Sequence, residues 1–251
     1  MSDLSWFDGA KPNAQDFSFD GPQRKITGAL WLPEDYSSTT SLVLCGHGAS
    51  GDRYQAPIPY LARGFIVAGV GVLAIDGPVH GLRQVGDGGR AAFFAEMQRD
   101  GFIDDMVADW QAALQAITQA KGINGSLAYF GLSMGTIFGV PLLASETEFT
   151  TAVIGLCGIN GAAASISERL SRDARNIHHP VAFLMQLEDE LFPRDGYLAL
   201  FDEIAAADKR LHANPGLHPE VPAEEVDFAL EFILSRLAGD IERRIINPLA
   251  E

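Results

Sequence analysis

A serine flanked by glycines lies in residues 131–135, which read GLSMG and match the pattern G-x-S-x-G. In this pattern the serine occupies a strained turn between a strand and a helix, and the glycines let the two elements pass close together. The hydroxyl then stands at the carboxyl end of the strand, beside the N–H groups and the positive dipole end of the helix. Ser133 is therefore the candidate nucleophile for an acyl transfer.

A serine hydroxyl needs a base to take its proton, and the base needs a carboxylate to orient it. In chains with this kind of turn, the three groups follow in the order serine, acid, histidine. Asp189 comes just after an apolar run at 181–187 and is our choice for the acid, with the flanking Glu188 and Glu190 as rivals. The alternative interpretation of these carboxylates is a solvated acidic turn.

Four histidines follow Ser133, and their positions separate them. His178 and His179 precede the acidic segment, so they break the expected order. His212 falls within a weak strand pattern. His218 follows Pro-Gly-Leu in a loop ahead of the last helical pattern, where a mobile base belongs. We choose His218 as the base, although a lone histidine is more often a packed structural side chain.

A tetrahedral intermediate also needs two N–H donors for its oxyanion. The residue directly after the serine, Met134, would supply one of them. The second would come from the loop that follows an early apolar run, where residues 46–51 read GHGASG. Glycines in this loop let the backbone approach a substrate closely. The predicted oxyanion hole is the pair of N–H groups of Ala49 and Met134.

The same loop offers a competing interpretation, because residues 46–51 also match G-x-G-x-x-G, the fingerprint of a dinucleotide site. The next strand pattern ends in Asp76, as that fingerprint requires. Against it, Pro57 and Pro59 interrupt the helix that should follow the glycines, and Asp76 comes late. Two antiparallel-looking strands also precede the motif. We therefore rank nicotinamide-cofactor binding below hydrolysis.

Apolar residues near the expected strand ends are candidates for the wall of a substrate pocket. They are Phe93, Phe94, Met97, Leu191 and Phe192. Ordinary packing explains these five side chains equally well.

The elements that must position these residues alternate along the chain. Two antiparallel strands are expected within residues 15–33, and further strands at 41–45, 71–76, 127–132, 151–157, 181–187 and 209–213. Helical patterns occupy residues 58–69, 91–98, 104–120, 163–172, 196–207 and 222–237, and another helix follows Ser133. This alternation predicts an α/β fold, with a mostly parallel central sheet and helices on both faces. The connecting segments 77–100 and 158–178 are short and leave little room for a cap domain.

Composition sets the broad class. The chain has 251 residues, 47% of them hydrophobic and 20% charged, which suits one folded domain over residues 1–251. Its net charge of −15 argues against nucleic-acid partners and anionic membrane surfaces. We expect no membrane span, because no apolar run reaches about 18 residues. The formation of a homo-oligomer stays open.

Two cysteines and the first residues bear on location. Cys45 and Cys157 lie in apolar runs and are expected to be buried thiols, not a disulfide. Residues 1–8 lack the basic and apolar regions of a secretory signal. Both features indicate a reducing, cytoplasmic compartment.

Taken in order, these segments resemble the α/β-hydrolase superfamily, and most closely its compact esterases of the dienelactone hydrolase and acyl-peptidase-like branch. Residues 47–49 are similar to the HG-x oxyanion segment, 76–81 to the D-x-P-G-H-G turn, 189–193 to D-x-x-V-P and 216–218 to G-x-H. Val79 stands where glycine is usual, and Phe192 where valine is usual. The resemblance covers roughly residues 15–238.

The resemblance implies the α/β-hydrolase fold and structural, not catalytic, roles for His47 and His80. Dienelactone hydrolases proper use a cysteine nucleophile, so Ser133 argues against that narrow activity. The sequence thus predicts a serine hydrolase that cleaves carboxylic esters of small molecules through an acyl-enzyme, with no cofactor and no metal. A peptidase or thioesterase with the same triad is the near alternative, and a non-catalytic binding protein on this fold is the alternative from another class.

Overall fold

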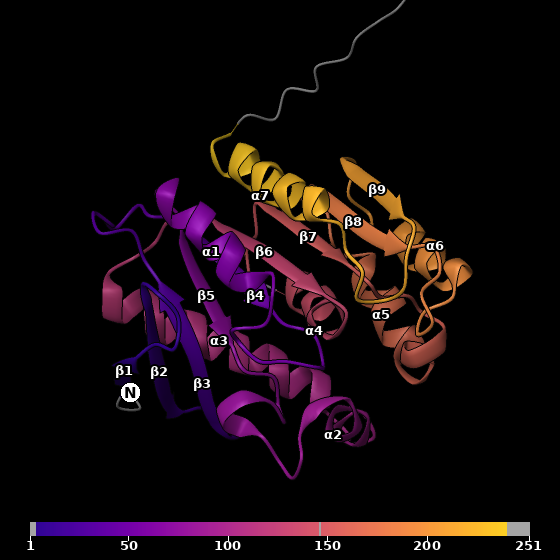
Figure 1. Cartoon of the computed structure of the whole chain (residues 1–251), viewed down its shortest axis with the longest axis horizontal. Coiled ribbons are helices and arrows are strands. Elements are labelled where there is room, and N and C mark those ends of the chain that lie inside the picture. Colours follow the sequence, from indigo (N-terminus) through magenta and orange to yellow (C-terminus); the bar gives the residue numbers. More distant parts are fainter. Residues whose placement is uncertain (1–3, 146, 240–251) are drawn as a thin grey trace, which may run out of the picture.

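One mixed sheet with helices on both faces makes up the computed structural model, which describes residues 4–145 and 147–239 (Figure 1). The strands are β1 (Ser5–Asp8), β2 (Ala14–Asp20), β3 (Lys25–Trp31), β4 (Leu42–Gly46), β5 (Gly71–Ile75), β6 (Leu127–Leu132), β7 (Thr151–Gly155), β8 (Val181–Gln186) and β9 (Lys209–Asn214). Their order in the sheet is β1-β2-β3-β5-β4-β6-β7-β8-β9. Strands β1, β2, β3 and β5 pair antiparallel in succession, and β4 to β9 are mutually parallel. The predicted fold class is confirmed.

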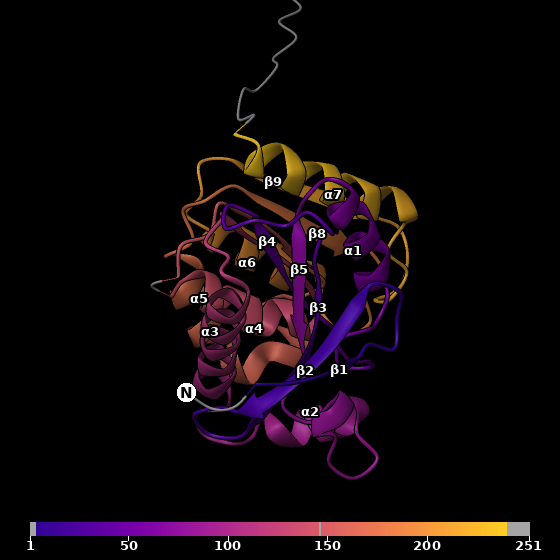
Figure 2. The ribbon, with the colours of Figure 1, turned by 90° about the vertical axis from the view of Figure 1, so that its left-hand side faces the viewer.

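The helices divide between the two faces of the sheet. They are α1 (Ile58–Val67), α2 (Gly89–Glu96), α3 (Phe102–Lys121), α4 (Met134–Leu143), α5 (Ser167–Ala174), α6 (Arg194–Glu203) and α7 (Ala223–Leu237). Helices α1 and α7 pack on one face, and α3 to α6 pack on the other (Figure 2). None of the described helices is long and apolar enough to cross a membrane. In the described residues only short helical segments are inserted between strands on the side of the site, and no large cap is present.

Strand β4 illustrates why the central strands are almost wholly apolar. Leu42 and Leu44 pack into the core beneath α3 and α4, whereas Val43 and Cys45 face α1 and α7. All four side chains are inaccessible to solvent. Each buried aliphatic side chain contributes about 1.5–3 kcal/mol of hydrophobic stabilisation, so a polar residue is excluded from either face. Two-sided burial therefore sets where the strand ends and where its loop begins.

One strand was missed in the sequence analysis, and one expected helix needs correction. Strand β1 was not predicted from the sequence, because it is a four-residue edge strand that is mostly exposed and, within the described residues, pairs with β2 alone. The helix expected at 163–172 is instead a 3₁₀ segment, Gly161–Ile166, followed by α5 from Ser167. Both differences lie at places where the apolar periodicity is short, and neither changes the parallel core.

The carboxyl ends of the parallel strands all lie on the same side of the sheet, as the arrowheads of β6 to β9 show in Figure 1. The loops that leave this edge carry the predicted oxyanion segment after β4, Ser133 after β6, Asp189 after β8 and His218 after β9. Residues far apart in the sequence are therefore brought to one rim by the topology.

Candidate active site

Ser133 occupies the turn between β6 and α4 in a backbone conformation that non-glycine residues rarely adopt. Its φ is 59° and its ψ is −119°. Such a conformation persists only where the surroundings hold it, and here the Ser133 N–H donates to the carbonyl of Gly155 at 2.9 Å. The neighbouring glycine is required by packing, because a Cβ on Gly135 would lie 2.5 Å from the Gly46 carbonyl oxygen. The turn thus presses α4 against β4 and leaves the serine hydroxyl at the rim.

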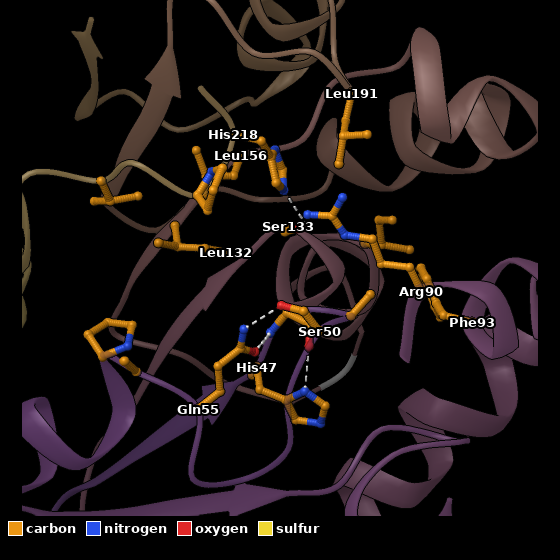
Figure 3. A pocket seen from close by; sticks show the side chains of 18 of the residues that line it. His47, Ser50, Gln55, Arg90, Phe93, Leu132, Ser133, Leu156, Leu191 and His218 are labelled. Atoms are coloured by element: carbon orange, nitrogen blue, oxygen red, sulfur yellow. Dashed lines mark hydrogen bonds between the residues drawn. The ribbon is translucent and has the colours of Figure 1, made fainter. Parts of the chain in front are cut away.

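The structure brings together the three side chains that the sequence analysis selected (Figure 3). Nε2 of His218 lies 2.9 Å from Oγ of Ser133, and Nδ1 of the same ring lies 2.7 Å from Oδ2 of Asp189. Ser133 makes no side-chain capping bond to α4, and among the described residues only the imidazole of His218 contacts its hydroxyl through a hydrogen bond. His218 is only 5% exposed. Since one ring nitrogen faces the acid and the other faces the alcohol, the imidazole is placed to take the serine proton.

The carboxylate of Asp189 is held by four donors. Oδ1 accepts the N–H groups of Leu191 (2.7 Å) and Phe192 (3.0 Å), and Oδ2 accepts the hydroxyl of Tyr197 as well as the His218 ring. Burial favours the neutral acid, but these hydrogen bonds together outweigh it and lower the pKa of Asp189 below its usual value. An ionised carboxylate therefore faces the imidazole at neutral pH.

A cavity of about 250 Å³ opens beside Ser133. Of the five predicted wall residues, Phe93, Phe94, Leu191 and Phe192 line it. Met97 does not, which corrects that expectation: it follows the last residue of α2 and is buried in the core. The rest of the wall is also largely apolar and includes residues that carried no sequence signal, among them Leu132, Ile137, Leu156 and Val226. The cavity is thus suited to an apolar acyl or alcohol group next to the serine.

The predicted oxyanion segment is held by two histidines. Nδ1 of His47 donates to the carbonyl of Gly48 (2.8 Å), and its Nε2 accepts the N–H of Gly77 (2.8 Å). Burial lowers the pKa of His47 to about 4, so the ring is neutral at pH 7 and can serve both roles. Nε2 of His80 donates to the carbonyl of Ala49 (3.0 Å). Both rings have structural contacts, as the family resemblance implied.

These contacts leave two N–H groups unused near the serine. Among the described residues, no acceptor faces the N–H of Ala49 or that of Met134. The N–H of Gly48, in contrast, is bonded to Oε1 of Gln55 at 2.7 Å. An orphan N–H at a helix start or loop is a ready donor for an anion.

Several solved structures are similar to this chain over almost its whole length. A cold-adapted esterase from an Arctic intertidal metagenomic library, in its PEG-bound form, is 33% identical to this chain, with a TM-score of 0.81. The match covers 92% of this chain and 99% of that esterase. The chain belongs to the esterases of the α/β-hydrolase superfamily. No family model matches the sequence, and a search of curated proteins finds no match.

Solved structures of lower sequence identity also share the fold of this chain. An acetyl xylan esterase from Paenibacillus sp. R4 is 16% identical with a TM-score of 0.71, over 94% of this chain and 88% of that enzyme. A puromycin hydrolase is 19% identical with a TM-score of 0.70, over 96% of this chain but only 42% of the hydrolase. The fold is thus shared with an acetyl xylan esterase and with part of a puromycin hydrolase.

The histidine loop of the esterase is fastened by three glutamates. The consecutive N–H groups of residues 216–218 donate to Glu188 (2.5 Å), Glu220 (2.7 Å) and Glu190 (2.9 Å), respectively. Glu188 and Glu190, the rivals of Asp189 in the sequence analysis, therefore bind the loop backbone and not the imidazole. The bond from the His218 N–H lowers the pKa of Glu190.

The other three downstream histidines lie away from Ser133. His212 is bonded through Nδ1 to Glu225 at 2.8 Å and packs on Phe228, with ring centroids 4.3 Å apart. His178 and His179 precede β8 and so lie at the amino ends of the parallel strands, opposite to Ser133. The chain-order argument that set these residues aside agrees with their placement.

The structure of this chain does not support a dinucleotide site in the loop at residues 46–51. The Asp76 carboxylate is fully buried and accepts bonds from Thr27 Oγ1, two nitrogens of Arg53 and the N–H of Leu82. It has no free oxygen for a ribose. Helix α1 begins only at Ile58, so the glycines do not lead straight into a helix. Asp76 instead ties the loops of the site to the antiparallel edge of the sheet.

Two further positions escaped the sequence analysis. Oγ1 of Thr136 lies 2.6 Å and 2.8 Å from the carbonyls of Gly155 and Gly131 and accepts the Gly155 N–H at 2.8 Å, so it ties α4 to β6 and β7 below Ser133. Tyr197 reaches Asp189 from α6. Neither belongs to a motif, and only the tertiary pairing reveals them. Within residues 4–145 and 147–239, no three His, Cys, Asp or Glu side chains form a group able to hold a metal ion.

Proposed function

We propose that this chain is a serine esterase that hydrolyses carboxylic esters of small molecules through an acyl-enzyme. Ser133 is the nucleophile, His218 the general base and Asp189 the carboxylate that orients the base. The observation that carries the proposal is the continuous hydrogen-bonded chain from Asp189 Oδ2 through the imidazole to Ser133 Oγ, beside an apolar cavity. Membership of the esterase family supports the same reaction.

In the acylation step, Oγ of Ser133 attacks the ester carbonyl while its proton moves to Nε2 of His218. The Nδ1–H of the ring stays on the nitrogen and donates to Asp189, which stabilises the imidazolium. The tetrahedral intermediate collapses, the bond between carbonyl carbon and alcohol oxygen breaks, and His218 gives its proton to the departing alcohol.

The oxyanion is the point of largest charge development in this step. We assign its stabilisation to the N–H groups of Ala49 and Met134, which have no acceptor among the described residues. Such donors cost no reorganisation, because His80 already holds Ala49 through its carbonyl. The loss of one donor of this kind lowers kcat by about 10²–10³-fold.

Deacylation repeats the proton transfers with water. His218 takes a proton from a water molecule, the hydroxyl attacks the acyl carbonyl, and the serine leaves with the proton from the ring. The products are an alcohol and a carboxylic acid, and no external cofactor enters either half-reaction.

The decisive experiment replaces Ser133. Ser133→Ala should lower the hydrolysis of p-nitrophenyl acetate by about 10⁴-fold or more, while Ser126→Ala, an exposed position directly before the same strand, should leave it unchanged. A fluorophosphonate should add one equivalent to the wild-type protein, and peptide mass spectrometry should locate it at Ser133. Full activity of Ser133→Ala would refute the mechanism. Failure of the folded wild type to react with either reagent would favour a non-catalytic binding protein.

The leaving group is tested separately. Matched acetyl esters, acetyl thioesters and acetyl anilides should be cleaved with the ester preferred in kcat/KM over the anilide. An anilide preference would move the assignment to a peptidase, and a thioester preference to a thioesterase.

The cellular setting is a further part of this proposal. We place the enzyme in the cytoplasm, acting on a small-molecule substrate as one domain over residues 1–251. Cys45 and Cys157 are free and buried, and burial raises the pKa of both thiols, as in structural cysteines of reducing compartments. Cell fractionation with an antibody against the chain tests the location.

A further inference from the structure

The charge on the cavity wall differs from that of the whole chain. The chain carries 33 acidic and 18 basic residues, a net charge of −15. In the described structure, however, no aspartate or glutamate lines the cavity at Ser133. Arg90 does line it, from the first turn of α2. A strongly acidic protein thus presents a cationic wall at this site.

Arg90 is also unpaired, which sets it apart from many other arginines of the chain. Arg53 binds Asp16 and Asp76, and Arg83 binds Asp109. For Arg90, in contrast, the described residues offer neither an ion pair nor a hydrogen bond. Figure 3 shows its guanidinium reaching from α2 into the cavity, on the side of Ser133. Its five N–H donors are therefore available to a bound molecule.

A second polar group of the wall is also a donor. Oγ of Ser50 accepts a hydrogen bond from Nε2 of Gln55 at 2.9 Å, and no acceptor among the described residues takes the proton of the Ser50 hydroxyl. Ser50 lines the same cavity. The glutamates near His218 direct their carboxylates to the backbone N–H groups of residues 216–218 and do not line the cavity.

We propose that Arg90 selects esters that carry a carboxylate in addition to the ester group, and that it binds this carboxylate while Ser133 attacks. Arginine pairs with a carboxylate through two parallel hydrogen bonds, which fix orientation as well as add affinity. The apolar part of the wall would hold the chain between the two groups. This inference rests on the proposed esterase function and names the class of ester.

The test compares esters that differ only in charge. In the first pair, monoethyl glutarate and its neutral amide ethyl glutaramate place the anion in the acyl half. In the second pair, 3-acetoxypropanoate and 3-acetoxypropanamide place it in the alcohol half. We expect the wild type to prefer the anion in one pair by about 10- to 100-fold in kcat/KM. Arg90→Gln should bring that ratio close to one, Arg90→Lys should give an intermediate ratio, and Arg90→Glu should invert it.

Arg63→Gln is the matched control. Arg63 is exposed on α1, packs on Tyr60 and does not line the cavity, so its replacement changes the net charge equally. The anion ratio of this variant should equal that of the wild type. A wild-type ratio of one or less in both pairs would overturn the inference, and so would a preference that Arg90→Gln retains.

The outcomes separate this inference from the proposed function. Cleavage of the neutral esters that depends on Ser133, without any preference for the anion, would leave the esterase standing and remove the role of Arg90. If no ester is cleaved, the proposed function falls. Calorimetric titrations of Ser133→Ala with monoethyl glutarate and with 3-acetoxypropanoate then still decide the inference, because the binding of at least one of these anions must weaken at least tenfold when Arg90→Gln is added.

Discussion

Tyr197 donates a hydrogen bond from its hydroxyl to Oδ2 of Asp189, the carboxylate oxygen that also lies 2.7 Å from Nδ1 of His218. Tyr197 is fully buried on α6, and its ring packs edge-on against Phe183 and Phe192. The acid is thus held by a rigid side chain from the helix that follows its own loop. The orientation of the imidazole depends on this arrangement behind it.

The first prediction concerns Tyr197→Phe, which keeps the ring and removes the bond. The hydrogen bond favours the ionised form of Asp189, so its loss should raise the pKa of that carboxyl. The acid limb of the kcat/KM profile should then be steeper at its low-pH end, because a protonated Asp189 no longer orients the base. If about 1 kcal/mol of orientation is lost in the transition state, kcat should fall about fivefold. Steady-state kinetics from pH 4 to 8 measure both effects.

Tyr60→Phe is the control for this prediction. It removes a tyrosine–aspartate hydrogen bond of the same type, to Asp227, on the exposed surface. Its pH profile should match that of the wild type. If Tyr197→Phe also leaves the profile unmoved, Tyr197 is a packing residue only.

The elements and the site differ in how far the sequence could predict them. Ser133 could be predicted from the sequence because its turn is encoded locally, by glycines at fixed spacing around it. Asp189 and His218 were selected from chain order, because parallel strands deliver their loops to one edge. Tyr197 and Thr136 could not be predicted from the sequence, since each acts through a partner that only the tertiary packing brings near.

Residues of the wall were harder to predict than the elements. Leu156 lines the cavity, and its φ is 50°. Leucine rarely adopts this backbone conformation, so the sequence does not predict it. Met97 was assigned to the wall because it is apolar and near the expected strand ends, but at the C-terminal end of α2 it is buried in the core. Arg90 was not predicted as a site residue because a single exposed arginine matches no sequence motif. Its significance depends on the absence of a carboxylate beside it among the described residues.

The second prediction concerns Thr136→Val, beneath the serine turn. The isosteric change removes the acceptor of the Gly155 N–H and the donor to the Gly155 or Gly131 carbonyl, all of them buried. Buried polar groups without partners cost roughly 1–3 kcal/mol. The free energy of unfolding in urea should fall by about this amount. Thr136→Ser, which keeps the hydroxyl, should recover most of the loss, and equal destabilisation by both variants would assign the effect to packing.

The third prediction concerns the loop that carries His218. Glu190→Ala removes the acceptor of the His218 N–H, whereas Glu190→Gln keeps an acceptor without charge. We expect kcat to fall by roughly two- to fivefold in the alanine variant and to stay close to wild type in the glutamine variant. Glu231→Ala, an exposed acidic residue on α7, controls for the change in net charge. Equal losses in all three variants would show that charge, not the bond to the loop, is responsible.

The last prediction uses the titration of His47. Burial is the main cause that lowers its pKa to about 4, with a smaller contribution from His80, while the Gly48 carbonyl, Asp76 and Asp52 oppose the shift. In the unfolded chain the ring titrates near 6.5. Between pH 6.5 and about 4 the unfolded state therefore binds one more proton at this position, so stability falls as pH falls. The stabilisation at neutral pH that is lost across this window is about 3 kcal/mol.

His47→Gln isolates this contribution, because the amide can donate to Gly48 and accept from Gly77 without titrating. The slope of unfolding free energy against pH should be smaller in the variant by about one proton, or roughly 1.4 kcal/mol per pH unit, between pH 4.5 and 6. Urea titrations at intervals across this range measure it. His179, whose pKa burial also lowers to about 4, stays in both proteins and cancels in the difference. Identical slopes would mean that His47 is protonated in the folded enzyme, and its bond from the Gly77 N–H would then have to be abandoned.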